Sequence, residues 1–189
     1  MYRPEPFRAD DPALVRQIIA AYPFASLISV VGGVPLVSHI PFVLDGDVIL
    51  GHVARASPHH AALDGECVVT FLGPHAYVSP RWYRSPESHV PTWNYVTVHV
   101  HGRPEVVEAG PAALRMAAVF DSSWQPGPGV DEIAAGITAF RVPLDRVELK
   151  LKLSQNRDPA DAERVQVALD GGNEAERGVA AWMLRVRRS

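Results

Sequence analysis

Apolar and polar residues alternate in several short runs along the chain, a pattern typical of β-strands with one buried face. Glycine, proline and aspartate separate the runs and favour tight turns. Gly32-Gly33 and Asp45-Gly46 therefore predict hairpin turns between the first three runs. The pattern predicts strands over residues 24–31, 34–43, 47–53, 67–72, 93–101 and 103–107, and two more within 137–151.

Helical signals stand near both ends of the chain and between the strands. Apolar residues recur every four positions over residues 12–22 and predict a helix with one buried stripe. Asn173, with Glu176 three residues later, has the form of a capping box that starts a last helix. Other helices are predicted over 57–64 and 111–121, and between Asp158-Pro159 and Gly171-Gly172. We expect residues 1–157 to form a barrel of short strands. Residues 158–189 are expected to form a helical extension packed on the barrel or on a partner.

Composition narrows the class of protein. The 189 residues include 17 prolines and 14 glycines, which favours many short, sharply turned elements and hence a barrel. A formal net charge of −3 argues against direct DNA binding. No apolar run approaches the roughly 20 residues of a membrane helix, and the first residues lack a secretory apolar stretch. We therefore expect a cytoplasmic protein that does not enter a membrane.

Residues 51–58 combine a strand with a helix start. Ser57 followed by Pro58 is typical of an N-cap and the first helical position. A helix start offers free N–H groups and Arg55 offers a planar fork of donors, so the segment, with His52 beside it, suits a phosphate. The alternative is an ordinary strand-to-helix junction with a surface arginine.

Two polar residues, Ser38 and His39, interrupt an otherwise apolar strand. Pro41 follows them and marks an edge strand or a bulge, where a ligand can reach backbone groups. The alternative is that His39 is an ordinary core residue with a satisfied hydrogen bond.

Aromatic residues are dense over the long loop predicted at 73–92 and in the segment Trp93-Asn94-Tyr95 that follows it. Such density can build a wall against a planar ligand. It can equally form a homodimer core, where tryptophan, tyrosine and arginine are enriched. The pattern favours the homodimer core. Both interpretations are correct if the planar ligand lies within the dimer interface.

The end of the last predicted strand carries a row of polar side chains. Period-two alternation places Lys150, Lys152 and Ser154 on one face, and Gln155 and Asn156 fall at the strand's end. The row suits a polyanionic or amide-bearing ligand. A solvated strand face is the alternative.

Metal binding and nucleophilic catalysis find little support in the sequence. His99 and His101 share a strand face, but no HExxH motif, carboxylate facial triad or cysteine cluster accompanies them. The serines lack a GxSxG elbow. The one cysteine, Cys67, lies in a strand that should be buried and inert. We expect no metal.

Six blocks of sequence resemble one known family, namely FASLIS from residue 24, SHIPF from 38, GHVARASP from 51, FLGPHAYVSPRWY from 71, VPTWNYVTVHVHG from 90 and KLSQNR from 152. Together they resemble the PaiB family of FMN-binding negative transcriptional regulators. The resemblance implies a mainly β (α+β) fold, a split β-barrel of the FMN-binding and pyridoxamine phosphate oxidase-like type with flanking helices. It also implies a homodimer with FMN in a groove at the dimer interface.

The resemblance further implies which residues hold the flavin. Arg55 would be the main cation for the phosphate, and the strand of Ser38 would run along the isoalloxazine ring. The full set of expected cofactor-binding residues is Ser38, His39, His52, Arg55, Ser57, Trp93, Asn94, Tyr95, Lys152, Ser154 and Gln155.

The chain departs from the family where the family has a glycine before the KLSQNR lysine. Leu149-Lys150-Leu151 stands there, after a shortened connecting segment, so we expect the roof of the pocket to differ. Two alternative functions remain open. One is a flavin-dependent oxidoreductase acting on a small molecule, and the other is a haem-binding or haem-degrading split barrel.

Overall fold

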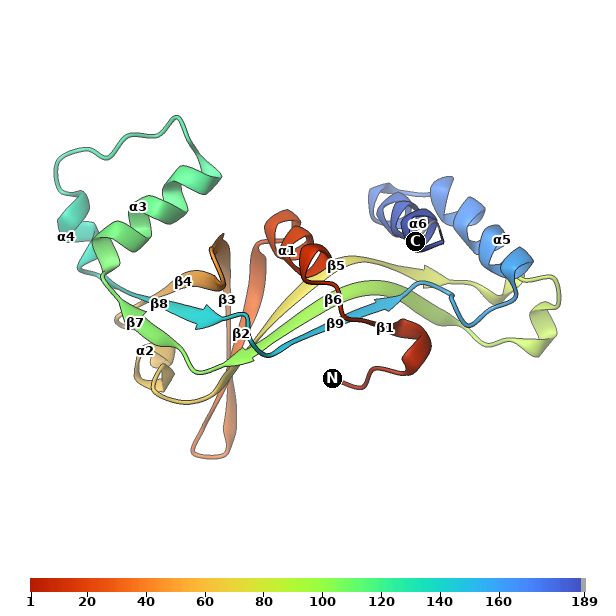
Figure 1. Cartoon of the computed structure of the whole chain (residues 1–189), viewed down its shortest axis with the longest axis horizontal. Helices are drawn as coiled ribbons and strands as arrows, with labels where there is room; N and C mark the ends of the chain where they lie inside the picture. The colour runs from red at the N-terminus through yellow and green to blue at the C-terminus, as the bar shows by residue number, and fades with distance from the viewer. Residues whose placement is uncertain (188–189) are drawn as a thin grey trace. The chain divides into compact units, whose positions relative to one another are not determined.

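A computed structural model describes residues 1–187, apart from the side chains at positions 131 and 133. Nine strands form one antiparallel sheet in the order β1-β9-β6-β5-β2-β3-β4-β8-β7. The chain divides into two compact units. The first holds residues 1–11, 72–97 and 149 onward, and the second holds residues 12–71 and 98–148. Strands β5, β6 and β9, which are labelled in Figure 1, contribute residues to both units.

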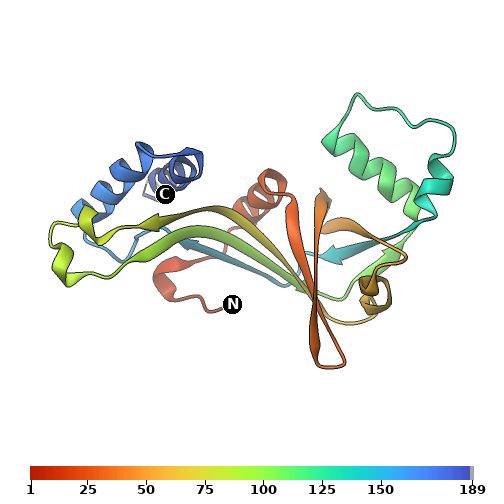
Figure 2. The same cartoon turned by 180° about the vertical axis from the view of Figure 1, so that it is seen from behind.

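The first unit joins the chain's two ends to the middle of the sequence. Its strand β1 pairs with β9 through Arg8 and Lys150. Helices α5 and α6 lie side by side in both views (Figures 1 and 2). Its elements are η1 (Glu5–Phe7), β1 (Arg8–Ala9), the later part of β5 (Cys67–Val78), η2 (Pro80–Trp82), η3 (Pro86–Ser88), the first part of β6 (Thr92–Gly102), most of β9 (Val147–Lys152), α5 (Pro159–Asp170) and α6 (Glu174–Val186).

The second unit is built from consecutive antiparallel strands and the helix that covers them. Buried Ala112 and Met116 of its helix α3 pack against Val43, Leu50 and Ala139 of the sheet. Besides the remaining parts of β5, β6 and β9, its elements are α1 (Pro12–Ala21), β2 (Phe24–Val31), β3 (Val34–Asp45), β4 (Val48–Ala54), α2 (Pro58–Ala62), β7 (Glu105–Val107), α3 (Ala109–Phe120), α4 (Val130–Ala134) and β8 (Ile137–Pro143).

Three phenylalanine rings form the centre of the second unit's core. Phe42 meets Phe71 and Phe140 edge-on, with ring centroids 5.9 Å apart in each pair, and all three are fully buried. This geometry is favoured by the ring quadrupole. Gly51 on the neighbouring strand lies directly against the Phe42 ring, because β3 and β4 pair these two residues.

Local signals in the sequence predicted most elements correctly. Gly32, Gly33 and Gly46 all have positive φ, as their hairpin turns require. The capping box at Asn173 is also confirmed, since its side chain accepts from the Glu176 N–H and the Glu176 carboxylate accepts from the Asn173 N–H.

One expectation about the strands is wrong, and the expectation for Pro41 holds locally. Residues 73–78, predicted as loop, extend β5 to Val78, and their alternate side chains are buried. Strand β3 lies between β2 and β4 in the sheet order, but it pairs with β2 only up to Pro41 and with β4 only from Phe42 onward. Within residues 1–187, each stretch of β3 therefore has one unpaired edge, and Pro41 lies in a locally edge-like position, as predicted. Pro41 sits where β3 changes partner, so its missing N–H removes no bond from a continuous ladder.

Candidate functional site

The start of helix α2 in the second unit differs from the anion site that its sequence suggests. Ser57 caps the helix as predicted, because its Oγ accepts from the His59 N–H. The N–H groups of Ser57 and His60 donate to the carbonyls of Ala54 and Ser57, and Pro58 has no N–H. The free backbone donors expected at this helix start are therefore already used by the chain itself.

Arg55 is the cation of this junction and is exposed. Its Nε donates to the Ala135 carbonyl at 2.7 Å, and its backbone N–H donates to the Gly136 carbonyl at 2.9 Å. These two bonds tie the end of β4 to the start of β8. Of the guanidinium, only Nε is used by these bonds, and its two amino groups can still bind an anion.

His59 links two of the expected residues, Ser38 and Ser57. Its Nδ1 lies 2.6 Å from Ser38 Oγ, and its backbone N–H is capped by Ser57. The ring is fully buried, and its Nε2 has no hydrogen-bond partner among the described residues. Burial lowers the pKa of His59, so the ring is held neutral. The sequence does not single out His59 as a site residue, because adjacent histidines in a short helix do not reveal which ring points inward.

His39 and His52 make separate contacts. His39 is exposed on β3 and its Nδ1 lies 2.9 Å from Ser26 Oγ on β2. His52 is half-buried on β4, with its Nδ1 3.4 Å from the sulfur of Met116 on α3, and burial lowers its pKa. Ser38 and His39 point to opposite faces of β3, as neighbouring strand residues do.

A buried polar pair, Asn94 and Ser154, lies in the first unit. Asn94 Nδ2 donates to Ser154 Oγ at 2.9 Å, and Met183 of α6 lies 3.5 Å from the same nitrogen. Both polar residues are at most 4% exposed. Ser154 has a φ of +68°, a left-handed conformation that costs a side chain about 1–2 kcal/mol. The hydrogen bonds to Asn94 hold the hydroxyl in this turn.

Tyr95 lies beneath two lysine ammonium groups in the same unit. Lys150 Nζ is 5.3 Å and Lys152 Nζ 5.9 Å from the centre of its ring, so both lysines share one face of β9, as the alternation predicts. Lys152 Nζ also donates to Thr92 Oγ1, and Lys150 Nζ donates to the Tyr2 carbonyl. Burial first, and the positive charge of Lys150 second, lower the pKa of Lys152.

The last two expected residues of this unit differ in their accessibility. Trp93 is half-exposed on β6, near the rings of His75 and Tyr77. The Gln155 side chain instead closes its own turn, donating to the Leu151 carbonyl at 2.6 Å and accepting from the Leu153 N–H at 2.7 Å. Trp93 therefore offers an aromatic surface, whereas Gln155 has its amide already engaged.

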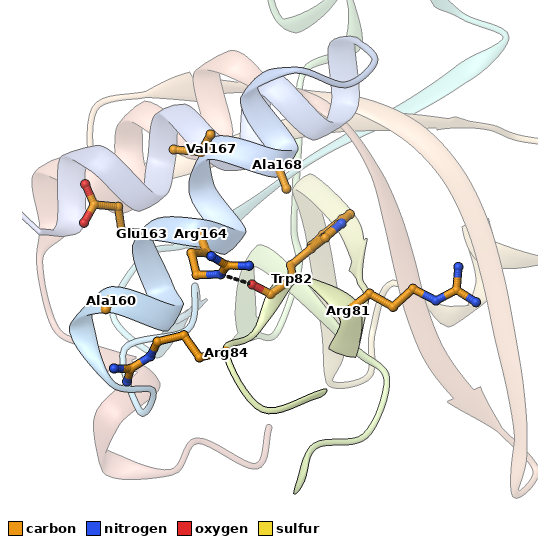
Figure 3. A pocket seen from close by; sticks show the side chains of 8 residues that line it. All are labelled: Arg81, Trp82, Arg84, Ala160, Glu163, Arg164, Val167 and Ala168. Carbon is orange, nitrogen blue, oxygen red and sulfur yellow. Dashed lines mark hydrogen bonds between the residues drawn. The ribbon is translucent and has the colours of Figure 1, made fainter. Parts of the chain in front are cut away.

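A groove of about 640 Å³ lies between η2 and α5 in the first unit (Figure 3). The Arg164 Nε donates to the Trp82 carbonyl at 2.8 Å, and Arg84 pairs with Asp158 and Asp161 at its end. None of the expected cofactor residues lines it. Its lining residues are Arg81, Trp82, Arg84, Ala160, Glu163, Arg164, Val167 and Ala168.

The chain is similar to several known proteins. The family described as putative FMN-binding domain matches residues 1–146. The protease synthase and sporulation protein PAI 2 of Bacillus subtilis is 27% identical over 178 residues, with 85% of each chain covered.

Solved structures share the fold. An FAD and haem binding protein from Mycobacterium smegmatis superimposes with a TM-score of 0.67 at 20% identity, over 88% of this chain and 80% of that one. A putative pyridoxamine 5'-phosphate oxidase from Listeria innocua gives 0.51 at 14% identity, over 72% of this chain and 95% of that one. The predicted mainly β split barrel with flanking helices is confirmed. Within residues 1–187, no helix has the length and apolar character needed to span a bilayer.

Proposed function

The chain belongs to the putative FMN-binding domain family, and from that premise we propose that it is a homodimeric FMN-binding protein of the PaiB type. The observation that carries the proposal is the family match over residues 1–146, which includes the whole junction around Arg55. Bound flavin supplies reversible electron and hydride transfer, while the protein supplies binding and orientation. The cytoplasmic location expected from the sequence is part of the same proposal.

The donors at this junction fit a flavin phosphate. Arg55 is an exposed guanidinium that the bond to the Ala135 carbonyl holds in place, and an arginine fork matches phosphate geometry. Ser57 adds a hydroxyl two residues further along the chain. His59 supports the junction from within, because its buried ring lies 2.6 Å from Ser38 Oγ through Nδ1. The phosphate would therefore depend on side chains rather than on the helix start.

The residues expected to contact the flavin come from both units of the chain. In the second unit, Ser38, His39 and His52 would contact the flavin together with the Arg55–Ser57 junction. In the first unit the proposed contacts are Trp93, Asn94, Tyr95, Lys152, Ser154 and Gln155. Trp93 suits a planar ring because half of its surface is exposed. Gln155 has its amide engaged by the backbone, and Asn94 and Ser154 are buried against each other, so these three residues would have to rearrange to contact the flavin.

Exposed apolar side chains support a homodimer. Val31 and Val34, which pair across the β2–β3 hairpin, are 52% and 66% exposed. Clustered apolar exposure of this kind is typical of protein interfaces. We expect light scattering on an eluting gel-filtration peak to give twice the 20.6 kDa chain mass. A peak at the single-chain mass would contradict the dimer.

The flavin site is tested by titrating FMN against the protein and following flavin fluorescence. We expect Arg55→Ala to weaken binding by about 10- to 150-fold, the scale of a hydrogen bond to a charged group. Arg103→Ala removes another exposed arginine, outside the junction, and should leave the affinity unchanged. Equal affinities of wild type and Arg55→Ala would place the phosphate elsewhere.

The same preparation separates the related functions. A regulatory role fits this chain without direct DNA contact, because its net charge is −3, so a gel shift at physiological salt should show no complex. Turnover of bound flavin with a nicotinamide donor would favour the oxidoreductase. A Soret band after haem titration would favour a haem-binding split barrel.

A further inference from the structure

We propose that His99, His101 and Glu148 form a binding site for a divalent transition-metal ion. Each residue offers one ligand atom, and the three atoms all lie within 4.8 Å of one another. All three side chains are half-buried, so an ion there would be partly shielded yet reachable from solvent. The cluster lies wholly in the second unit and includes none of the residues proposed to hold flavin.

Two neighbouring strands create the cluster. His99 and His101 lie two residues apart on β6, so they share one face while Val98 and Val100 are buried on the other. Their ring centroids are 6.2 Å apart. The His101 N–H donates to the Arg146 carbonyl at 2.9 Å, which brings the beginning of β9 alongside β6. Glu148, two residues further on, then faces the histidine pair.

The distances suit coordination after a small adjustment. His101 Nε2 and Glu148 Oε2 are 3.0 Å apart. Two ligands at about 2.0–2.1 Å from a zinc ion and 3.0 Å from each other subtend roughly 90° at the ion. Ligand atoms of a tetrahedral ion lie about 3.4 Å apart, so the most widely separated pair has to close by at most about 1.5 Å. Rotation of half-exposed side chains can supply such a movement.

The chemistry of the donors defines the class of ion. Imidazole nitrogen suits Zn²⁺, Co²⁺, Ni²⁺, Cu²⁺ and Fe²⁺, whereas Mg²⁺ and Ca²⁺ prefer oxygen ligands throughout. One carboxylate offsets half of the ion's charge. Three protein ligands leave a tetrahedral ion one open position, which is the arrangement of catalytic rather than purely structural zinc sites. The simpler alternative is that His101 and Glu148 form only a hydrogen-bonded pair.

The test uses the full chain without an affinity tag, stripped of metal and titrated with ZnCl₂ in a calorimeter. We expect one Zn²⁺ per chain, and at least tenfold weaker binding in both His101→Ala and Glu148→Gln. His75→Ala is the matched control, because His75 is an exposed strand histidine outside the cluster, and it should bind zinc like the wild type.

Cobalt binding gives a spectroscopic readout of metal ligation, which would not change if Glu148 had only a structural role. Co²⁺ bound to the wild type should show visible d–d absorption, and that absorption should be lost in Glu148→Gln. This variant keeps the size of the side chain, so it can be tested even if His101→Ala fails to fold. Absence of zinc binding in the wild type would overturn the proposal. So would equal binding by the folded Glu148→Gln variant. Neither result bears on the flavin titration when that titration is also run on metal-free protein.

Discussion

Replacing Gly51 by alanine tests the packing at the centre of the second unit. A Cβ on Gly51 would lie 2.7 and 2.8 Å from two carbons of the Phe42 ring and 3.3 Å from a third. Contacts under 3.0 Å require something to move. The Phe42 ring cannot retreat, because it is fully buried and held edge-on between Phe71 and Phe140.

The magnitude follows from two opposing effects. Forcing one extra methyl group into a well-packed core costs about 1–3 kcal/mol. Alanine also restricts the unfolded chain more than glycine, which returns about 0.4–1 kcal/mol. The net loss in the free energy of unfolding is about 1–2 kcal/mol. For a chain of this length, each kcal/mol lowers the melting temperature by about 2–4 °C, so we expect a fall of about 2–8 °C.

Thermal denaturation followed by circular dichroism measures the effect. Gly65→Ala is the matched control, because its Cβ would meet only the Ala62 carbonyl oxygen at 3.6 Å, an ordinary contact. That variant should melt at the wild-type temperature or slightly above it. If Gly51→Ala has the same melting temperature as the wild type, Gly51 of β4 does not pack as tightly against the Phe42 ring as the structure shows.

Three further predictions concern the buried polar groups. Ser154→Gly should have a higher melting temperature than Ser154→Ala, since both lose the hydrogen bond to Asn94 but only alanine keeps the cost of a φ of +68°. Equal melting temperatures would show that the turn is not strained. Burial lowers the pKa values of His52 and His59, so the unfolded chain binds more protons than the folded chain below about pH 6.5. The free energy of unfolding, measured by urea denaturation, should therefore fall as the pH drops through that value. A free energy that stays constant between about pH 7 and 5.5 would contradict the burial of these rings in the neutral form. Burial raises the pKa of Cys67 to about 12, so a thiol reagent should react with it only after unfolding, and rapid reaction of the native protein would contradict its enclosure in β5.

Elements whose signal is local were predicted from the sequence alone. The hairpin glycines and the capping box at Asn173 each act within four residues, so their side chains determine the local backbone. The predicted helix over 12–22 and strand over 24–31 likewise agree with α1 and β2 to within one residue. The burial of Cys67 followed from its place in an apolar strand.

Features that depend on distant pairing could not be predicted in this way. Residues 73–78 carry a proline and a glycine and so indicate a loop, yet the close fit of Gly73 against Val96 within the first unit shows a strand there. Pro41 is tolerated because β3 exchanges partners at that residue, which only the pairing reveals.

The candidate site shows the same limit. His59 bonds to Ser38 from 21 positions away, and Glu148 reaches His101 across 47 positions. No spacing rule in the sequence connects such residues. The sequence therefore indicates histidines as candidates, but it does not indicate which serine or carboxylate each one contacts.

Retention of FMN is the most direct test of the proposed function. The purified chain is incubated with FMN, passed through gel filtration, and its visible absorption spectrum is recorded across the protein peak. We predict a flavin spectrum that coelutes with the protein at up to one FMN per chain and is much reduced in Arg55→Ala. A protein peak free of flavin absorption, from folded wild-type chain after saturation with FMN, would contradict flavin binding.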